Sequence, residues 1–65
     1  MYNTLRAEMA RKGITSSNIA TVLKKTKSTI SLKINGKNDF TLREAVKIRD
    51  FLGVDMSIDE LFKEE

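Results

Sequence analysis

Seven of the twelve basic residues of this 65-residue chain lie in one stretch that holds no acid. Aspartate and glutamate are absent from Met9 to Asn38. The basic residues of this stretch are Arg11, Lys12, Lys24, Lys25, Lys27, Lys33 and Lys37. The acids gather toward the C-terminus, so the net charge of +3 understates the separation. A surface that carries only positive charge suits a polyanionic partner. The chemistry indicated here is binding of a polyanion, and the charge alone would suit DNA, RNA, a membrane surface or another anionic partner.

Short polar side chains share one face of the segment 27–34. At ~100° per residue of a helix, Ile30 and Ile34 lie together on the face that we expect to meet the core. The outward face holds short polar residues, one apolar residue and two flanking lysines: Ser28, Thr29, Leu32, Lys27 and Lys33. Hydroxyls can reach base edges, an apolar group can contact a thymine methyl, and lysines can reach phosphate or guanine. This face suits the floor of a DNA major groove.

Residues that could support catalysis or hold a metal are missing. The chain has no cysteine and no histidine, which excludes thiolate and imidazole ligands and an imidazole base. It has no glycine-rich loop that could cradle a phosphate. Asp59 and Glu60 fall in the first turn of an expected helix, where the helix dipole favours acids. We therefore expect no enzyme, no cofactor, no metal and no small-molecule ligand.

The length allows one domain, which we expect to span residues 1–65. No apolar run approaches the ~20 residues of a membrane span, and the N-terminal segment lacks the apolar core of a signal peptide. We expect no contact with a membrane. The composition, which lacks cysteine, fits an intracellular protein, so the expected location is the cytoplasm.

Helix start and stop signals divide the chain into five helices. We expect helices over about 4–12, 16–23 or 16–24, 27–34 and 42–52, and a short one that begins after Ser57 and frays after Phe62. The expected N-caps are Asn3 or Thr4, then Thr15, Thr26, Thr41 and Ser57. Capping boxes are expected for Thr41 with Glu44 and for Ser57 with Glu60. Gly13, Gly53 and the Asn35-Gly36 pair are expected to end helices. The sequence predicts an all-α, compact five-helix domain.

Apolar residues cover more than half of the circumference of the helix expected over 42–52. One interpretation is a central helix that packs on several neighbours. The other is that part of this face forms a homodimer contact. The candidate dimer residues are Phe51, Ile58 and Phe62.

Residues 15–37 resemble the helix-turn-helix of the phage Cro and repressor family, also called the XRE-type family. Ala20 and Ile30 stand where the family has a small residue in one helix and an aliphatic residue in the next. The resemblance also rests on these stretches: Ser28-Thr29-Ile30-Ser31, Asn35-Gly36-Lys37, Phe40-Thr41-Leu42-Arg43-Glu44-Ala45 and Leu52-Gly53-Val54-Asp55. It covers about Leu5 to Phe62 and implies a lambda repressor-like fold with a helix-turn-helix over about 15–35.

The resemblance implies a binding mechanism. Segment 27–34 would lie in the major groove of double-stranded operator DNA, and two subunits would read half-sites ~34 Å apart. The implied base-reading residues are Lys27, Ser28, Ser31 and Leu32. The implied phosphate-binding residues are Ser16, Thr26, Lys33, Asn35, Lys37, Asn38 and Arg43. Thr26 also has an expected structural role as a cap, and Ser16 would bind at the start of its helix.

The chain departs from the family pattern at two places. The family has glycine and then an apolar residue in the turn, where this chain has Lys24 and Lys25. It has an apolar residue at the place of Lys33, so Leu32 could turn inward to fill the core instead.

The expected function is a sequence-specific transcriptional regulator that acts as a homodimer, weak or formed on DNA. Because the chain reads as a single DNA-binding domain, we expect a Cro-type repressor of a phage or mobile element in preference to a two-domain repressor. One alternative is an antitoxin that represses its own operon. Another is a protein-interaction module that kept the fold and lost DNA binding, although such a module has no need of an acid-free basic stretch.

Overall fold

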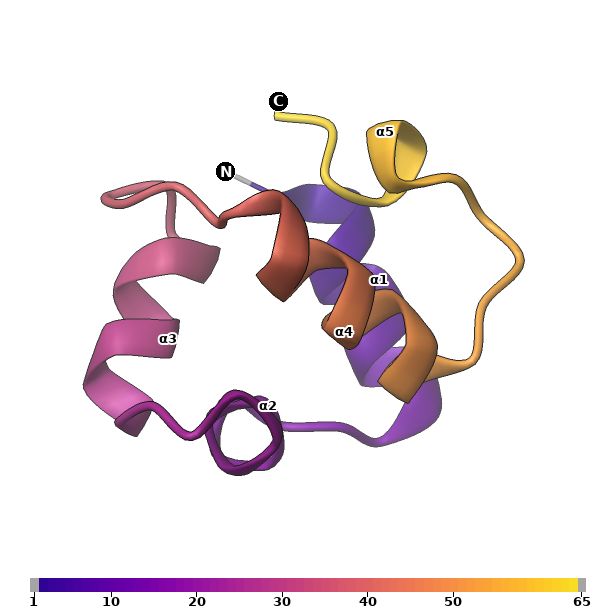
Figure 1. The fold of residues 1–65 in the computed structure, drawn as a ribbon. Helices are drawn as coiled ribbons and strands as arrows, with labels where there is room; N and C mark the ends of the chain where they lie inside the picture. Colours follow the sequence, from indigo (N-terminus) through magenta and orange to yellow (C-terminus); the bar gives the residue numbers. More distant parts are fainter. Residues whose placement is uncertain (1, 65) are drawn as a thin grey trace.

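The helices follow one another along the chain in the order that the sequence predicts. The computed structural model describes residues 2–64, and these residues form five helices and no strand. The helices are α1 (Asn3–Lys12), α2 (Ser16–Leu23), α3 (Lys27–Ile34), α4 (Leu42–Leu52) and α5 (Ile58–Leu61) (Figure 1). The expected all-α fold is confirmed. Met1 and Glu65, the two ends of the expected domain, lie outside the described residues.

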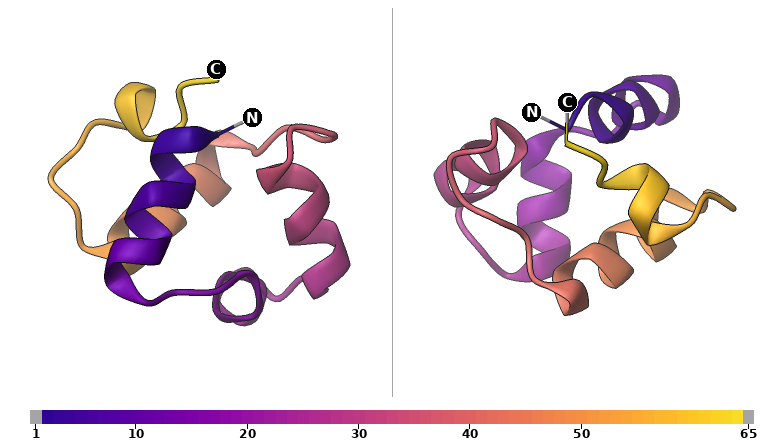
Figure 2. Two further views of the ribbon diagram at one scale, coloured as in Figure 1. Left: turned by 180° about the vertical axis from the view of Figure 1, so that it is seen from behind. Right: turned by 90° about the horizontal axis from the view of Figure 1, so that it is seen from above.

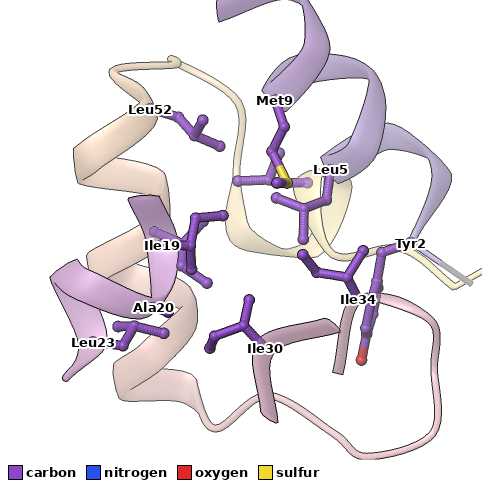
Figure 3. Packing of buried hydrophobic residues seen from close by; sticks show 11 residues of the cluster. Tyr2, Leu5, Met9, Ile19, Ala20, Leu23, Ile30, Ile34 and Leu52 are labelled. Atoms are coloured by element: carbon purple, nitrogen blue, oxygen red, sulfur yellow. The ribbon is translucent and has the colours of Figure 1, made fainter. Parts of the chain in front are cut away.

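Each of the five helices places one aliphatic side chain at the centre of the molecule. Five side chains are fully buried, one from each helix in chain order: Leu5, Ile19, Ile30, Ile48 and Leu61. Figure 3 shows labelled residues of the core cluster converging from α1, α2, α3 and α4. Burying such a side chain contributes roughly 1.5–3 kcal/mol. One shared core therefore fixes the orientation of all five helices, including α3.

Helix α2 packs against both α3 and α4. Ala20 is only 5% exposed, and its small side chain lets the neighbouring helices approach closely. In Figures 1 and 2, α3 lies at one edge of the molecule, with α2 on one side and the loop 35–41 leading from its end to α4. The face of α3 that turns away from the core is consequently open.

Four of the five helices begin with the cap that the sequence predicts. Thr15, Thr26, Thr41 and Ser57 each accept a hydrogen bond from the backbone N–H three residues later, at 3.1–3.3 Å. The Thr41–Glu44 capping box is complete. Thr15 also forms a box with Asn18, which the sequence analysis did not foresee. Helix α1 differs, because it begins at Asn3 with Tyr2 at the N-cap and no side-chain cap bond. The expected Asn3 or Thr4 cap is therefore wrong.

Helix α4 is central, yet part of its apolar surface is left open. Ala45, Ile48 and Leu52 are buried, which confirms the interpretation of a helix packed on several neighbours. Leu42 and Phe51 are exposed, at 72% and 43%. None of the described helices is long and apolar enough to cross a bilayer.

The turn between α2 and α3 is closed by a lysine in a conformation that favours glycine. Lys24 has φ 58° and is the only non-glycine residue with positive φ among those described. Its N–H donates to the Thr21 carbonyl at 3.3 Å, and the N–H of Lys25 donates to the Ala20 carbonyl at 2.9 Å. These two bonds are the Schellman pattern that ends a helix. The turn thus keeps the geometry of a glycine turn without the glycine.

Replacing Lys24 with glycine should stabilise the fold. A left-handed conformation costs a residue with a Cβ atom about 1–2 kcal/mol, and the greater freedom of glycine in the unfolded chain offsets part of that gain. We expect Lys24→Gly to raise the free energy of unfolding by about 0.5–1 kcal/mol in urea titrations. Lys25→Gly is the matched control and should give no gain. A loss of stability in Lys24→Gly would contradict the turn described here.

Candidate nucleic-acid interface

The outward face of α3 carries most of the residues that the sequence predicts to read bases. Lys27, Ser28 and Leu32 are exposed, and Ser31 is half-buried. Leu32 is 46% exposed, so it does not turn inward to fill the core. Ile30 and Ile34 hold the opposite face against the core, at 0% and 6% exposure. The helix thus presents hydroxyls and one isobutyl group to the outside from a rigid position.

A surface hollow of about 370 Å³ lies where α1, the start of α2 and the end of α3 meet. Its polar lining includes Ser16, Ser31 and Asn35, three residues that the sequence predicts to contact DNA. Arg6 from α1 also lines it. The first backbone N–H groups of α2 lie at this place, and such groups favour an anion. The structure therefore brings predicted base-reading and phosphate-binding residues to one concave surface.

Arg6 is the lining residue that the sequence analysis missed. It lies before the acid-free stretch, on a helix whose sequence pattern indicates only a packing role. Its side chain is exposed, and the helix wheel alone does not reveal that α1 approaches the start of α2 and the end of α3 at this hollow. A guanidinium here could pair with a phosphate through two hydrogen bonds.

The loop after α3 is anchored to the helix end by backbone bonds. Gly36 has φ 81° and donates to the Lys33 carbonyl, and the N–H of Lys37 donates to the Leu32 carbonyl at 2.9 Å. Asn35 has φ −82°, so Gly36 alone supplies the positive φ expected of this pair. The side chains of Asn35, Lys37 and Asn38 are all exposed. The anchor holds the backbone of this segment at the end of α3.

The helix wheel predicted that Lys33 lies on the shoulder of the outward face of α3. The structure places its side chain elsewhere. Its Nζ donates to both carboxylate oxygens of Glu44, at 2.7 and 3.0 Å. The two side chains are only 14% and 12% exposed, and the Nζ lies 5.9 Å from the centre of the Phe40 ring. The expected placement is corrected, because an ammonium bonded to a shielded carboxylate is not presented to a phosphate. The lysine fills the place of the family's apolar residue with its aliphatic stem.

The protonation of Glu44 reflects these contacts. Burial by itself raises the pKa of the Glu44 carboxyl. The hydrogen bonds from Lys33 and from the backbone of Thr41 outweigh that effect, with help from the charges of Lys33 and Lys25. The net result is a pKa below the ordinary value, so Glu44 is ionised at neutral pH.

The remaining predicted phosphate-binding residues lie at helix starts. Ser16 is the first residue of α2 and is half-buried, while Arg43 is exposed in the first turn of α4. Thr26 is exposed and caps α3, and its hydroxyl also donates to the hydroxyl of Thr29 at 2.9 Å. Its structural role as a cap is thereby confirmed.

The three candidate dimer residues differ in how open they are. Phe51 is 43% exposed, while Ile58 and Phe62 are half-buried. Phe62 stacks edge-on against Tyr2 and Phe40, with ring centres 5.8 and 5.2 Å apart. Phe62 thus has a packing role within its own subunit, and Phe51 is the most open of the three.

Comparison with known proteins agrees with this geometry. A helix-turn-helix family model matches residues 5–58, which include all of α1 to α4 except the first two residues of α1. No curated protein and no solved structure matches the chain. Membership of this family indicates a DNA-binding transcriptional regulator. The chain belongs to the XRE-type helix-turn-helix family.

Proposed function

We propose that the chain regulates transcription by placing α3 in the major groove of an operator half-site, in a binding role without an enzymatic step. The observation that carries this proposal is the open face of α3 beside the hollow that Arg6, Ser16, Ser31 and Asn35 share. A major groove is wide enough to admit one helix. The acid-free stretch that contains α3 is rich in positive charge, which favours the approach of DNA.

The residues then divide into two kinds of contact. Lys27, Ser28, Ser31 and Leu32 would read base edges and thymine methyls. The phosphate contacts would come from residues around them: Arg6, Ser16, Thr26, Asn35, Lys37, Asn38 and Arg43. Lys33 is left out of this set because its ammonium is bonded to Glu44. Phosphate contacts position the protein, and base contacts specify the sequence.

Variants of the two kinds should behave differently on DNA. Lys37→Ala should weaken binding to every duplex by a similar factor, because it removes a phosphate contact. Ser28→Ala or Leu32→Ala should change the preference among operator variants by about 1–3 kcal/mol at the affected base pair. Competition binding with a panel of duplexes measures both effects. Lys63→Ala, at an exposed lysine beyond α5, is the matched control and should leave all affinities unchanged. Identical behaviour of the two kinds of variant would contradict the assignment of faces.

We further propose a homodimer that reads two half-sites, with Phe51, Ile58 and Phe62 at or near the contact. The exposed ring of Phe51 supports this proposal. Sedimentation with and without operator DNA reports the oligomeric state. The finer proposal of a Cro-type repressor from a phage or mobile element, acting in the bacterial cytoplasm, rests on the sequence resemblance. A chain that bound no duplex would instead favour the protein-interaction alternative.

A further inference from the structure

The pair of Lys33 and Glu44 joins two elements that the chain separates by a loop. Lys33 lies in the last turn of α3, and Glu44 lies in the first turn of α4. Both carboxylate oxygens accept from the ammonium, and Oε1 also accepts from the backbone N–H of Thr41 at 2.9 Å. One carboxylate therefore fixes the end of α3, the end of the loop and the start of α4 together.

The loop 35–41 between them is held at a third point by aromatic packing. The Phe40 ring lies 5.5 Å from that of Tyr2 and 5.2 Å from that of Phe62, measured between ring centres. On the side of α3 it meets the ammonium of Lys33. Asn35, Lys37 and Asn38 belong to the first half of this loop, before Phe40 in the chain, and their side chains are exposed. Their position relative to α3 depends on the backbone bonds at the start of the loop and on the contacts of Lys33 and Glu44 that hold its end.

We propose that Lys33 and Glu44 are positioning residues for DNA binding, which keep the loop 35–41 and the first turn of α4 in register with the base-reading face of α3. The proposal rests on the proposed function. Ion-pair hydrogen bonds have directional geometry, whereas an apolar pair at the same place would pack without fixing the loop in one position. Replacing a shielded ion pair with apolar groups of similar size is often neutral or favourable for stability. The role of this pair is therefore expected in the placement of phosphate contacts more than in the stability of the fold.

The test compares the native chain with the double variant Lys33→Met/Glu44→Gln. Methionine keeps the length of the buried stem, and glutamine can still accept the capping bond from Thr41. Glu44→Gln or Lys33→Met alone leaves a shielded charge without its partner and risks unfolding. The double variant removes both charges, and its urea midpoint should equal or exceed that of the native chain.

We expect the folded double variant to bind the native chain's preferred duplex at least about tenfold more weakly. We also expect Lys37→Ala to cost less affinity in the double variant than in the native background, because a misplaced loop already loses that phosphate contact. A purely structural pair would not produce this coupling. Lys63→Ala is the control and should show no coupling in either background.

Hydrogen exchange in the free protein provides a readout that does not need DNA. The amides of Lys37 and Glu44 should exchange faster in the double variant, while those in the middle of α1 keep their protection. Unchanged protection of these amides would overturn the proposal. An equal cost of Lys37→Ala in both backgrounds, with native binding intact, would overturn it too. Failure of the native chain to bind any duplex would instead refute the proposed function, and the exchange experiment keeps the two outcomes apart.

Discussion

Raising the salt concentration from about 50 to about 200 mM should weaken binding to DNA by roughly 40-fold for a subunit that makes three cationic phosphate contacts. The expected contacts are those of Arg6, Lys37 and Arg43, whose side chains are all exposed. Each cation that neutralises a phosphate releases condensed counterions, so log K falls with a slope of about −0.9 per contact. A dimer on two half-sites should show about twice the slope of one subunit.

Single variants show which cations contribute to this slope. Lys37→Ala and Arg6→Ala should each reduce its magnitude by about 1. Lys63→Ala should leave it unchanged, since Lys63 lies beyond the end of α5 and is not one of the proposed phosphate contacts. Fluorescence anisotropy with a labelled duplex at several salt concentrations measures the slope. An affinity that does not depend on salt would contradict the nucleic-acid interface altogether.

Truncation of Ile30 should have the largest effect on stability. Its side chain is fully buried and holds α3 against the core. We expect Ile30→Ala to lower the free energy of unfolding by about 2–5 kcal/mol. A 65-residue domain has only about 3–10 kcal/mol in total, so much of the variant should be unfolded at 37 °C. Urea denaturation followed by circular dichroism measures this loss.

Two matched variants show whether the loss of stability depends on the burial of the side chain or only on the number of carbon atoms removed. Ile30→Val removes one methyl group and should cost about 0.5–1.5 kcal/mol. Leu32→Ala, two residues along the same helix, changes an exposed side chain and should stay within about 0.5 kcal/mol of the native chain. Equal losses for Ile30→Ala and Leu32→Ala would show that α3 does not face the core as described.

Local chemistry explains why the helix boundaries were predictable. A threonine or serine hydroxyl and the backbone N–H three residues later are close in sequence, so Thr15, Thr26, Thr41 and Ser57 could be recognised without a structure. The buried face of α3 followed from helical periodicity in the same way. The start of α1 was not predictable by this rule, because Tyr2 at its N-cap is held by packing and not by a side-chain cap bond.

Contacts between elements account for what the sequence did not reveal. The bond from Lys33 to Glu44 spans the loop 35–41, so no helix wheel places these residues together. The approach of Arg6 to the start of α2 likewise depends on how α1 packs. Lys24 shows a third case, in which the turn takes the left-handed conformation although no residue in it is a glycine.

Selection of preferred sites from random DNA duplexes tests the central claim most directly. With the native chain, we expect enrichment of one sequence made of two inverted half-sites about one helical turn apart, which would report the dimer as well. With Ser28→Ala or Leu32→Ala, we expect the enriched bases to change within each half-site while the spacing stays the same. No enrichment with the native chain, or the same enriched bases with these variants, would contradict the claim that α3 reads DNA.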